Sequence, residues 1–252
     1  LSHTVLLITT ERMNSRLQLP ISCKYYEYCD FLPQNVKKHV CCCIIHVMKD
    51  KNRKLSEQEE NRAAVFDKLA SHLQEEGYQR KDLTISVKDA NIKGMLAVAP
   101  DVIVWIILYI VFNTGKPMNT SMIFLVPLVI VGIVVHELLH GFVWGLCCED
   151  HFHSISFGFI WKMLTPYCTC SQPLKQSYYI AGSIAPYLLL GILPCAIGVI
   201  SSNLFVFLFG IIMVTGAAGD ILIIRMIRKD GRPDALYLDH PYECGTVAFY
   251  KE

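Results

Sequence analysis

The sequence has little charge and no basic stripe of the kind that binds nucleic acid. Only 18% of its 252 residues are Asp, Glu, Lys or Arg, and the formal net charge at pH 7 is +1. Proteins that bind nucleic acid carry a basic patch or stripe, so we expect no nucleic-acid partner. Hydrophobic residues make up 53% of the chain and gather in its second half. This distribution is typical of a small multispanning membrane protein.

Paired CxxC spacing is absent, although the chain has 11 cysteines. Cys41-Cys42-Cys43 and Cys168-Thr169-Cys170 do not fit a structural zinc site, and cysteines within apolar segments behave as small hydrophobes. The stretch from Leu1 to Cys43 also lacks a basic region followed by a long apolar core, so we expect no cleavable signal peptide. These features argue against a disulfide-stabilised secreted domain.

Four apolar segments of membrane-spanning length follow one another, at about residues 95–112, 122–148, 178–200 and 203–227. We therefore predict an all-α integral membrane protein with about four transmembrane helices over residues 94–228. Pro186 and Pro194 make kinks in the third span plausible. The membrane lipid bilayer is the partner that this composition implies.

The flanking segments are polar. Residues 48–93 are expected to form a small cytosolic α/β preamble, with an amphipathic helix that begins at Ser56 and ends at Gly77, and a short strand near residues 82–88. Residues 229–252 are expected to be a cytosolic tail. Residues 1–47 show no helical or strand periodicity, and the polar run after Met48 resembles an ordinary amino terminus. Our hypothesis is that residues 1–47 are a non-native or disordered leader.

Lys and Arg flank the four spans unequally. They gather before the first span and after the fourth, whereas the loop before the second span carries only Lys116 and the turn near residue 202 carries none. The positive-inside rule then predicts cytosolic termini and a cytosolic loop over residues 149–176. That loop contains the alternating sequence SISFGFI, which predicts a hairpin beside the site described next.

The second span contains the motif His136-Glu137-Leu138-Leu139-His140. These are the only charged or imidazole side chains between Met122 and Cys148. Residues i and i+4 share one face of a helix, so both histidines can bind one metal ion, and Glu137 is placed to act as general base on a zinc-bound water. A metal-free Glu–His network is the alternative, but three ionisable groups at membrane depth need compensation. We favour the interpretation that these residues bind a metal ion.

A catalytic zinc site usually has three protein ligands, and Asp220 is the candidate for the third. It is the single ionisable residue between Asn203 and Ile224. Counted along parallel spans at ~1.5 Å per residue, His136 and Asp220 lie at similar depth. The small residues Gly216–Gly219 would allow close helix approach. The loop offers weaker candidates that we interpret as ordinary loop residues: Glu149, His151, His153, Cys168 and Cys170.

HELLHG in an apolar helix, a PYCxC loop, a Pro-containing apolar helix and a closing GAAGD helix together resemble membrane zincin metalloproteases of unknown function, related in pattern to site-2 proteases. The resemblance covers roughly residues 55–250. It implies peptide hydrolysis by zinc (Zn2+), within or next to the membrane, on a protein or peptide substrate that is membrane-associated. It also implies an aspartate as third ligand, at Asp220. The metzincin extension is absent, since Val143 and Leu146 stand where its Gly and third His belong.

We therefore predict a multi-pass membrane zinc metalloprotease whose active-site side faces the cytosol. His136, His140 and Asp220 are the expected zinc ligands, and Glu137 is the expected catalytic base. Two alternatives stay open: a non-catalytic metal-binding membrane protein, and a metal or ion transporter. Four spans without an evident internal repeat are unlike a typical secondary transporter.

Overall fold

The computed structural model describes residues 57–115, 122–160, 165–241 and 243–251. The predicted leader over residues 1–47 and the predicted helix cap at Ser56 lie outside these residues. The described chain is mostly helical, with two small antiparallel sheets. The expectation of an all-α protein with a small α/β preamble was therefore too narrow, because strands also form after the second and fourth apolar segments.

Helix α4 (Glu57–Glu75) confirms the predicted amphipathic helix. Its apolar face buries Phe66, Ala70 and Leu73 against strand residues of the larger sheet. The helix stops where Gly77 takes a positive φ of 88°, and the Tyr78 amide donates back to the Leu73 carbonyl at 2.9 Å. Glycine adopts this backbone conformation without the strain that a Cβ would cause.

The larger sheet has the strand order β1-β6-β5-β4, and every neighbouring pair is antiparallel. Its strands are β1 (Gln79–Ile85), β4 (Leu174–Lys175), β5 (Leu236–Asp239) and β6 (Cys244–Tyr250). Val247 and Phe249 are fully buried. Residues expected to be a tail thus supply two strands, of which β6 pairs with β1 of the preamble and β5 pairs with β6 and β4. Their apolar side chains are buried against α4.

The apolar segments form long helices. They are α5 (Val87–Asn113), α6 (Leu125–Cys147), the continuous run of α7 (Gln176–Pro186), the π-helical η3 (Tyr187–Ile192) and α8 (Leu193–Ile200), and the pair α9 (Leu204–Gly216) and α10 (Ala218–Asp230). Three of these are long and apolar enough to cross a membrane, and a fourth is added if the bent α9–α10 pair is one span. This agrees with a multi-pass membrane protein of about four spans.

The third span widens into a π-helical turn between two prolines. Pro186 ends α7 and Pro194 lies in the first turn of α8. Between them, the Leu193 amide bonds the Leu188 carbonyl, one residue further back than in an α-helix. Proline removes a backbone donor, and a π-helical turn lets the remaining groups pair. The two prolines made a kink plausible here, and the structure has a π-helical turn between them.

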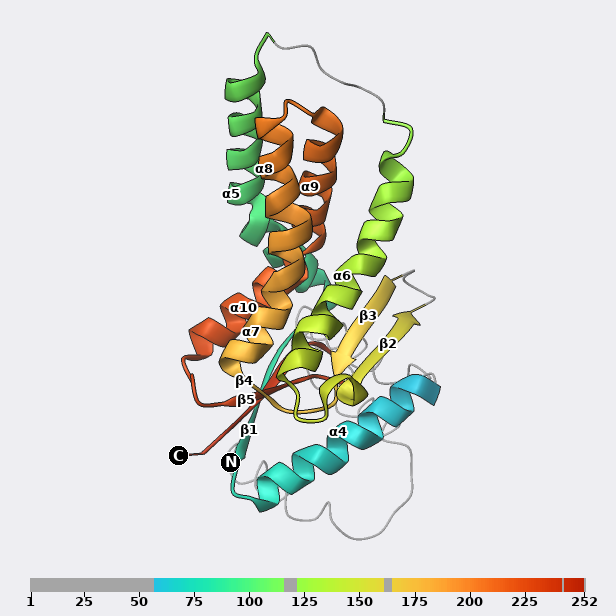
Figure 1. Ribbon diagram of the computed structural model, residues 1–252. Coiled ribbons are helices and arrows are strands. Elements are labelled where there is room, and N and C mark those ends of the chain that lie inside the picture. Colours follow the sequence, from blue (N-terminus) through green and yellow to red (C-terminus); the bar gives the residue numbers. More distant parts are fainter. Residues whose placement is uncertain (1–56, 116–121, 161–164, 242, 252) are drawn as a thin grey trace, which may run out of the picture. The chain divides into compact units, whose positions relative to one another are not determined.

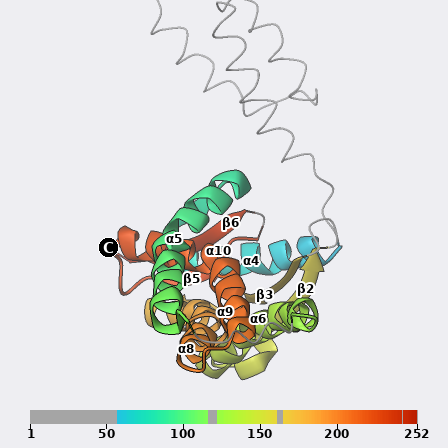
Figure 2. The same ribbon diagram turned by 90° about the horizontal axis from the view of Figure 1, so that it is seen from above.

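In Figure 1, α5, α8 and α9 lie side by side at one end, while α4 and the sheet lie at the other. The view from above in Figure 2 places α9 between α5 and α6. Helix α6 runs from the apolar end towards the strands, and the second sheet flanks it. That sheet is a hairpin of β2 (Ile155–Ile160) and β3 (Thr165–Cys170), preceded by the short 3-10 helix η2 (His151–Ser154). The predicted SISFGFI hairpin is confirmed.

The fourth span is bent by 45° at Ala217, between α9 and α10. We had expected a continuous helix there. Ala218 packs so closely on α5 that a Cβ at Gly94 would lie 3.0 Å from the Ala218 carbonyl oxygen. Gly216 and Gly219, in contrast, have open space beside them. The close helix contact thus involves Ala218 and α5, and the two glycines take no part in it.

Candidate metal centre

Both histidines of HELLH lie on the buried face of α6. His136 is 8% exposed and His140 is 5% exposed. The two residues are four positions apart, so successive helical turns bring their rings together edge to face, with centroids 4.8 Å apart and planes at 77°. The apolar residues on the other faces of α6, such as Leu138, remain exposed along the helix. In a membrane these side chains would contact lipid, so the polar face points into the protein.

Asp220 lies against both histidines. Its Oδ2 is 3.1 Å from His136 Nε2, and its Oδ1 is 3.5 Å from His140 Nε2. The three ligand atoms all lie within 4.8 Å of one another. The bend at Ala217 puts Asp220 in the first turn of α10, where the helix dipole stabilises a carboxylate. Within the described residues, this is the only group of three or more His, Cys, Asp or Glu residues placed to hold a metal ion.

The donor set fits a zinc ion. Zinc binds imidazole nitrogen and carboxylate oxygen at ~2.0–2.2 Å in tetrahedral geometry, which separates two ligand atoms by roughly 3.3–3.5 Å. The contacts of 3.1 and 3.5 Å come from different oxygens of Asp220, and one ligand atom from each of the three residues lies within 4.8 Å of the other two. Two neutral imidazoles and one carboxylate also form a ligand type that catalytic zinc sites use. Three protein ligands leave one position for water or substrate.

A backbone carbonyl orients His140. Its Nδ1 lies 2.9 Å from the Gly182 carbonyl oxygen of α7, so Nδ1 carries the hydrogen and donates it. Nε2 faces Asp220, and it would offer its lone pair to a metal ion bound between them, as is usual for ligating histidines. The ring also stacks on Trp144, with centroids 5.2 Å apart and planes at 16°. A Cβ at position 182 would overlap the Trp144 indole, which is why glycine stands there.

Glu137 points into the same cavity as the ligands without joining them. The cavity has a volume of about 230 Å³, and its lining includes His136, Glu137, His140 and Asp220. Gly216 and Gly219 also line it, so the open space beside these glycines is the space next to the metal centre. The Glu137 carboxylate accepts a hydrogen bond from the Cys168 backbone. A carboxylate in this position can exchange a proton with a water molecule in the cavity.

The hairpin forms one wall of this cavity through Pro166, Tyr167 and Cys168 of β3. Burial raises the pKa of the Cys168 and Cys170 thiols, so both remain protonated near neutral pH. Only the thiolate is a good metal ligand. His151 and His153 are exposed on η2. Of the loop candidates, therefore, only Cys168 adjoins the metal centre, and it does so as a neutral group.

Three further residues of the site carried no signal in the sequence. Gly182 sets the orientation of His140, and Tyr179 and Asp239 line the cavity. The Tyr179 hydroxyl donates to Asp239 at 2.5 Å, and the Cys170 amide donates to the same carboxylate at 3.3 Å. Burial raises the pKa of Asp239. Asp239 comes from β5, and only the assembled sheet brings that strand to the site.

Comparison with known proteins places the candidate metal centre within a family model. The chain has no significant match among curated proteins or among solved structures. Residues 129–233 match the model of a family described as "Putative zincin peptidase". The matched stretch is less than half of the chain, but it contains the whole HELLH motif and Asp220. The similarity to zincin peptidases therefore covers the complete candidate metal centre.

Proposed function

We propose that this chain is a zinc-dependent peptidase of the membrane, with His136, His140 and Asp220 as zinc ligands and Glu137 as the catalytic base. The observation that carries the proposal is the convergence of α6 and α10. It brings three zinc-type donors together and leaves Glu137 free in the same cavity. A structural metal site needs only ligands, whereas peptide hydrolysis needs such a base.

When bound, zinc supplies Lewis acidity that activates water and polarises a carbonyl group. Residues of the chain transfer the proton, orient the ligands and exclude water. Glu137 accepts the proton of the attacking water and later delivers it to the leaving amine. The Gly182 carbonyl keeps His140 in one tautomer throughout. The cavity walls from α6, α7 and β3 limit the access of bulk water.

A membrane-associated peptide is the substrate class that the surroundings favour. A second cavity, of about 270 Å³, adjoins the metal centre and shares His136 and Glu137 with it. Its other walls include Val129, Ile133 and Ile212 on α6 and α9, two helices of the apolar end. An apolar peptide segment could reach Glu137 through this cavity without crossing the polar sheet.

The experiment compares the native chain with Glu137→Gln, both purified in detergent micelles and loaded with zinc. We expect Glu137→Gln to retain about one zinc ion per chain, because the carboxylate is not a ligand, and to lose hydrolysis of a quenched fluorescent peptide library. Joint loss of zinc and activity would show that Glu137 is a ligand. Full zinc occupancy with no hydrolysis by the native chain would favour a non-catalytic metal site.

A further inference from the structure

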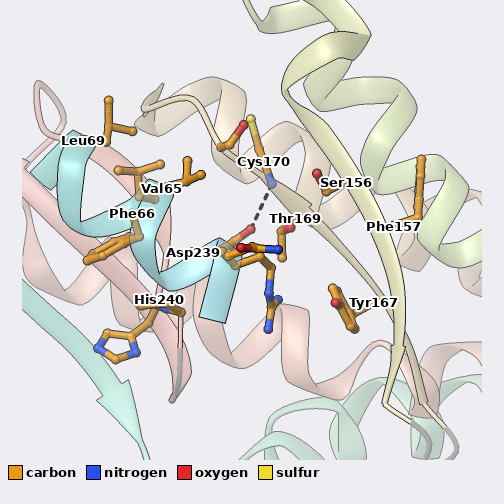
Figure 3. A pocket seen from close by; sticks show the side chains of 15 residues that line it. Val65, Phe66, Leu69, Ser156, Phe157, Tyr167, Thr169, Cys170, Asp239 and His240 are labelled. Carbon is orange, nitrogen blue, oxygen red and sulfur yellow. Dashed lines mark hydrogen bonds between the residues drawn. The ribbon is translucent and has the colours of Figure 1, made fainter. Parts of the chain in front are cut away.

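A further cleft, separate from the two cavities described above, opens beside the metal cavity and outside the apolar helices. It has a volume of about 360 Å³, within the range of ligand-binding pockets. In Figure 3, Val65, Phe66 and Leu69 of α4 lie on one side of the cleft, and Phe157 and Tyr167 of the hairpin lie on the other. These apolar side chains thus face the cleft from α4 and from the hairpin, which are far apart in the chain, and β5 adds Leu238 and Asp239 to the lining.

The cleft adjoins the metal cavity, because Tyr167 and Asp239 line both spaces. A peptide chain that extends from the metal centre away from the apolar helices and past these two residues would reach this cleft. Because Val65 and Phe157 are each about half exposed (50% and 52%), the apolar walls are open to an incoming segment.

One buried guanidinium nitrogen in the cleft lacks a hydrogen-bond acceptor among the described residues. The Arg62 guanidinium lies over the Tyr167 ring, with its central carbon 4.4 Å from the ring centroid. Its Nε is buried and, within the described residues, has no hydrogen-bond partner. The nearby carboxylate of Asp239 interacts electrostatically with Arg62, but its hydrogen bonds are to the Tyr179 hydroxyl and the Cys170 amide. A buried donor without an acceptor is costly, so it marks a place for a ligand acceptor.

We propose that this cleft is a substrate subsite that binds the extramembrane part of the peptide and recognises a carboxylate through Arg62. The inference rests on the proposed peptidase function. The apolar walls would hold aliphatic side chains, and Arg62 would pair with an acidic side chain or with a free C-terminal carboxylate. Both sources present the same planar, charged acceptor to the guanidinium.

The test measures binding of three rhodamine-labelled octapeptides to the zinc-loaded full chain with Glu137→Gln, so that the peptide is not cut. All three contain Ala, Leu and Gly. The first has one Gln and an amidated C-terminus; the second replaces Gln by Glu; the third keeps Gln and has a free C-terminal carboxylate. We expect the second or third peptide, or both, to bind about tenfold more tightly than the first. The choice between them identifies the carboxylate source.

Arg62→Gln should abolish this preference while zinc content stays unchanged. Arg228→Gln is the matched control, because it removes an exposed charge near the end of α10 and should keep the preference. Ser156→Glu provides a second variant. Ser156 is an exposed residue of β2 that lines the cleft. A carboxylate there should compete for Arg62 and reduce the preference, even if Arg62→Gln fails to fold.

The outcomes separate the subsite from the peptidase function. Equal binding of all three peptides to the parent, or a preference that survives Arg62→Gln, overturns the subsite. A preference that depends on Arg62, in a chain whose native form hydrolyses no peptide, supports the subsite and removes the peptidase function. Hydrolysis by the native chain without any carboxylate preference supports the peptidase function and overturns the subsite.

Discussion

Gly182→Ala should weaken zinc binding although residue 182 is not a ligand. The Gly182 carbonyl accepts the Nδ1 hydrogen of His140 at 2.9 Å and so directs Nε2 towards Asp220. A methyl group at position 182 would overlap the Trp144 indole. Trp144 is buried and also donates to the Tyr179 carbonyl at 3.1 Å, so it cannot simply turn away. We expect α7 to shift, which would move the carbonyl of residue 182 away from His140.

Two estimates agree on the size of this effect. Inserting a methyl group into a packed core costs about 1–3 kcal/mol. If most of that cost appears as a displaced carbonyl, zinc affinity falls by roughly 5- to 150-fold, since 1.4 kcal/mol corresponds to a factor of ten. Loss of a hydrogen bond that orients a metal ligand typically lowers affinity by about 10- to 100-fold. We therefore expect about a 10- to 100-fold loss.

Competition with a fluorescent zinc chelator measures the affinity of the purified protein in micelles. Gly198→Ala is the matched control, because a Cβ at Gly198 would overlap Phe207 and overpack α8, while neither residue lines the metal cavity, so the affinity should be unchanged. Adding Trp144→Leu to Gly182→Ala removes the overlap and should restore part of the affinity. Zinc affinity in Gly182→Ala within threefold of the native value would refute the orienting role of this carbonyl.

Three further predictions follow from the same geometry. Asp220→Ala should lower zinc affinity by more than the ~100-fold typical of an orienting residue, because it removes a ligand; full zinc occupancy in that folded, membrane-inserted variant would discard the assignment. Single cysteines placed at positions 202 and 160 of a cysteine-free chain should be labelled from opposite sides of the membrane, with 160 on the cytosolic side; labelling of 160 from outside would contradict the proposed sidedness. Cys168 and Cys170 should react slowly with iodoacetamide at pH 7–8, since burial raises their thiol pKa, and rapid alkylation of either in the folded protein would contradict their burial.

Much of the site was predictable because its chemistry is local. His136, Glu137 and His140 are delivered by two turns of one helix, so their spacing alone places both imidazoles on one face. Asp220 could be named because an ionisable residue in an apolar segment is costly and needs a partner. The long apolar runs likewise predicted about four membrane-spanning helices, and SISFGFI predicted the hairpin, since periodicity depends only on neighbouring residues.

The tertiary structure decided what depends on residues far apart in the chain. The bend at Ala217 sets where Asp220 points, and it arises where Ala218 packs on Gly94 of α5. The last residues became β5 and β6 because their apolar side chains needed α4 and β1 to cover them, which no pattern within residues 229–252 could show. The roles of Gly182 and Arg62 come from contacts with Trp144 and Tyr167, tens of residues away. Local sequence fixes which groups a helix presents, whereas packing between elements fixes which groups meet.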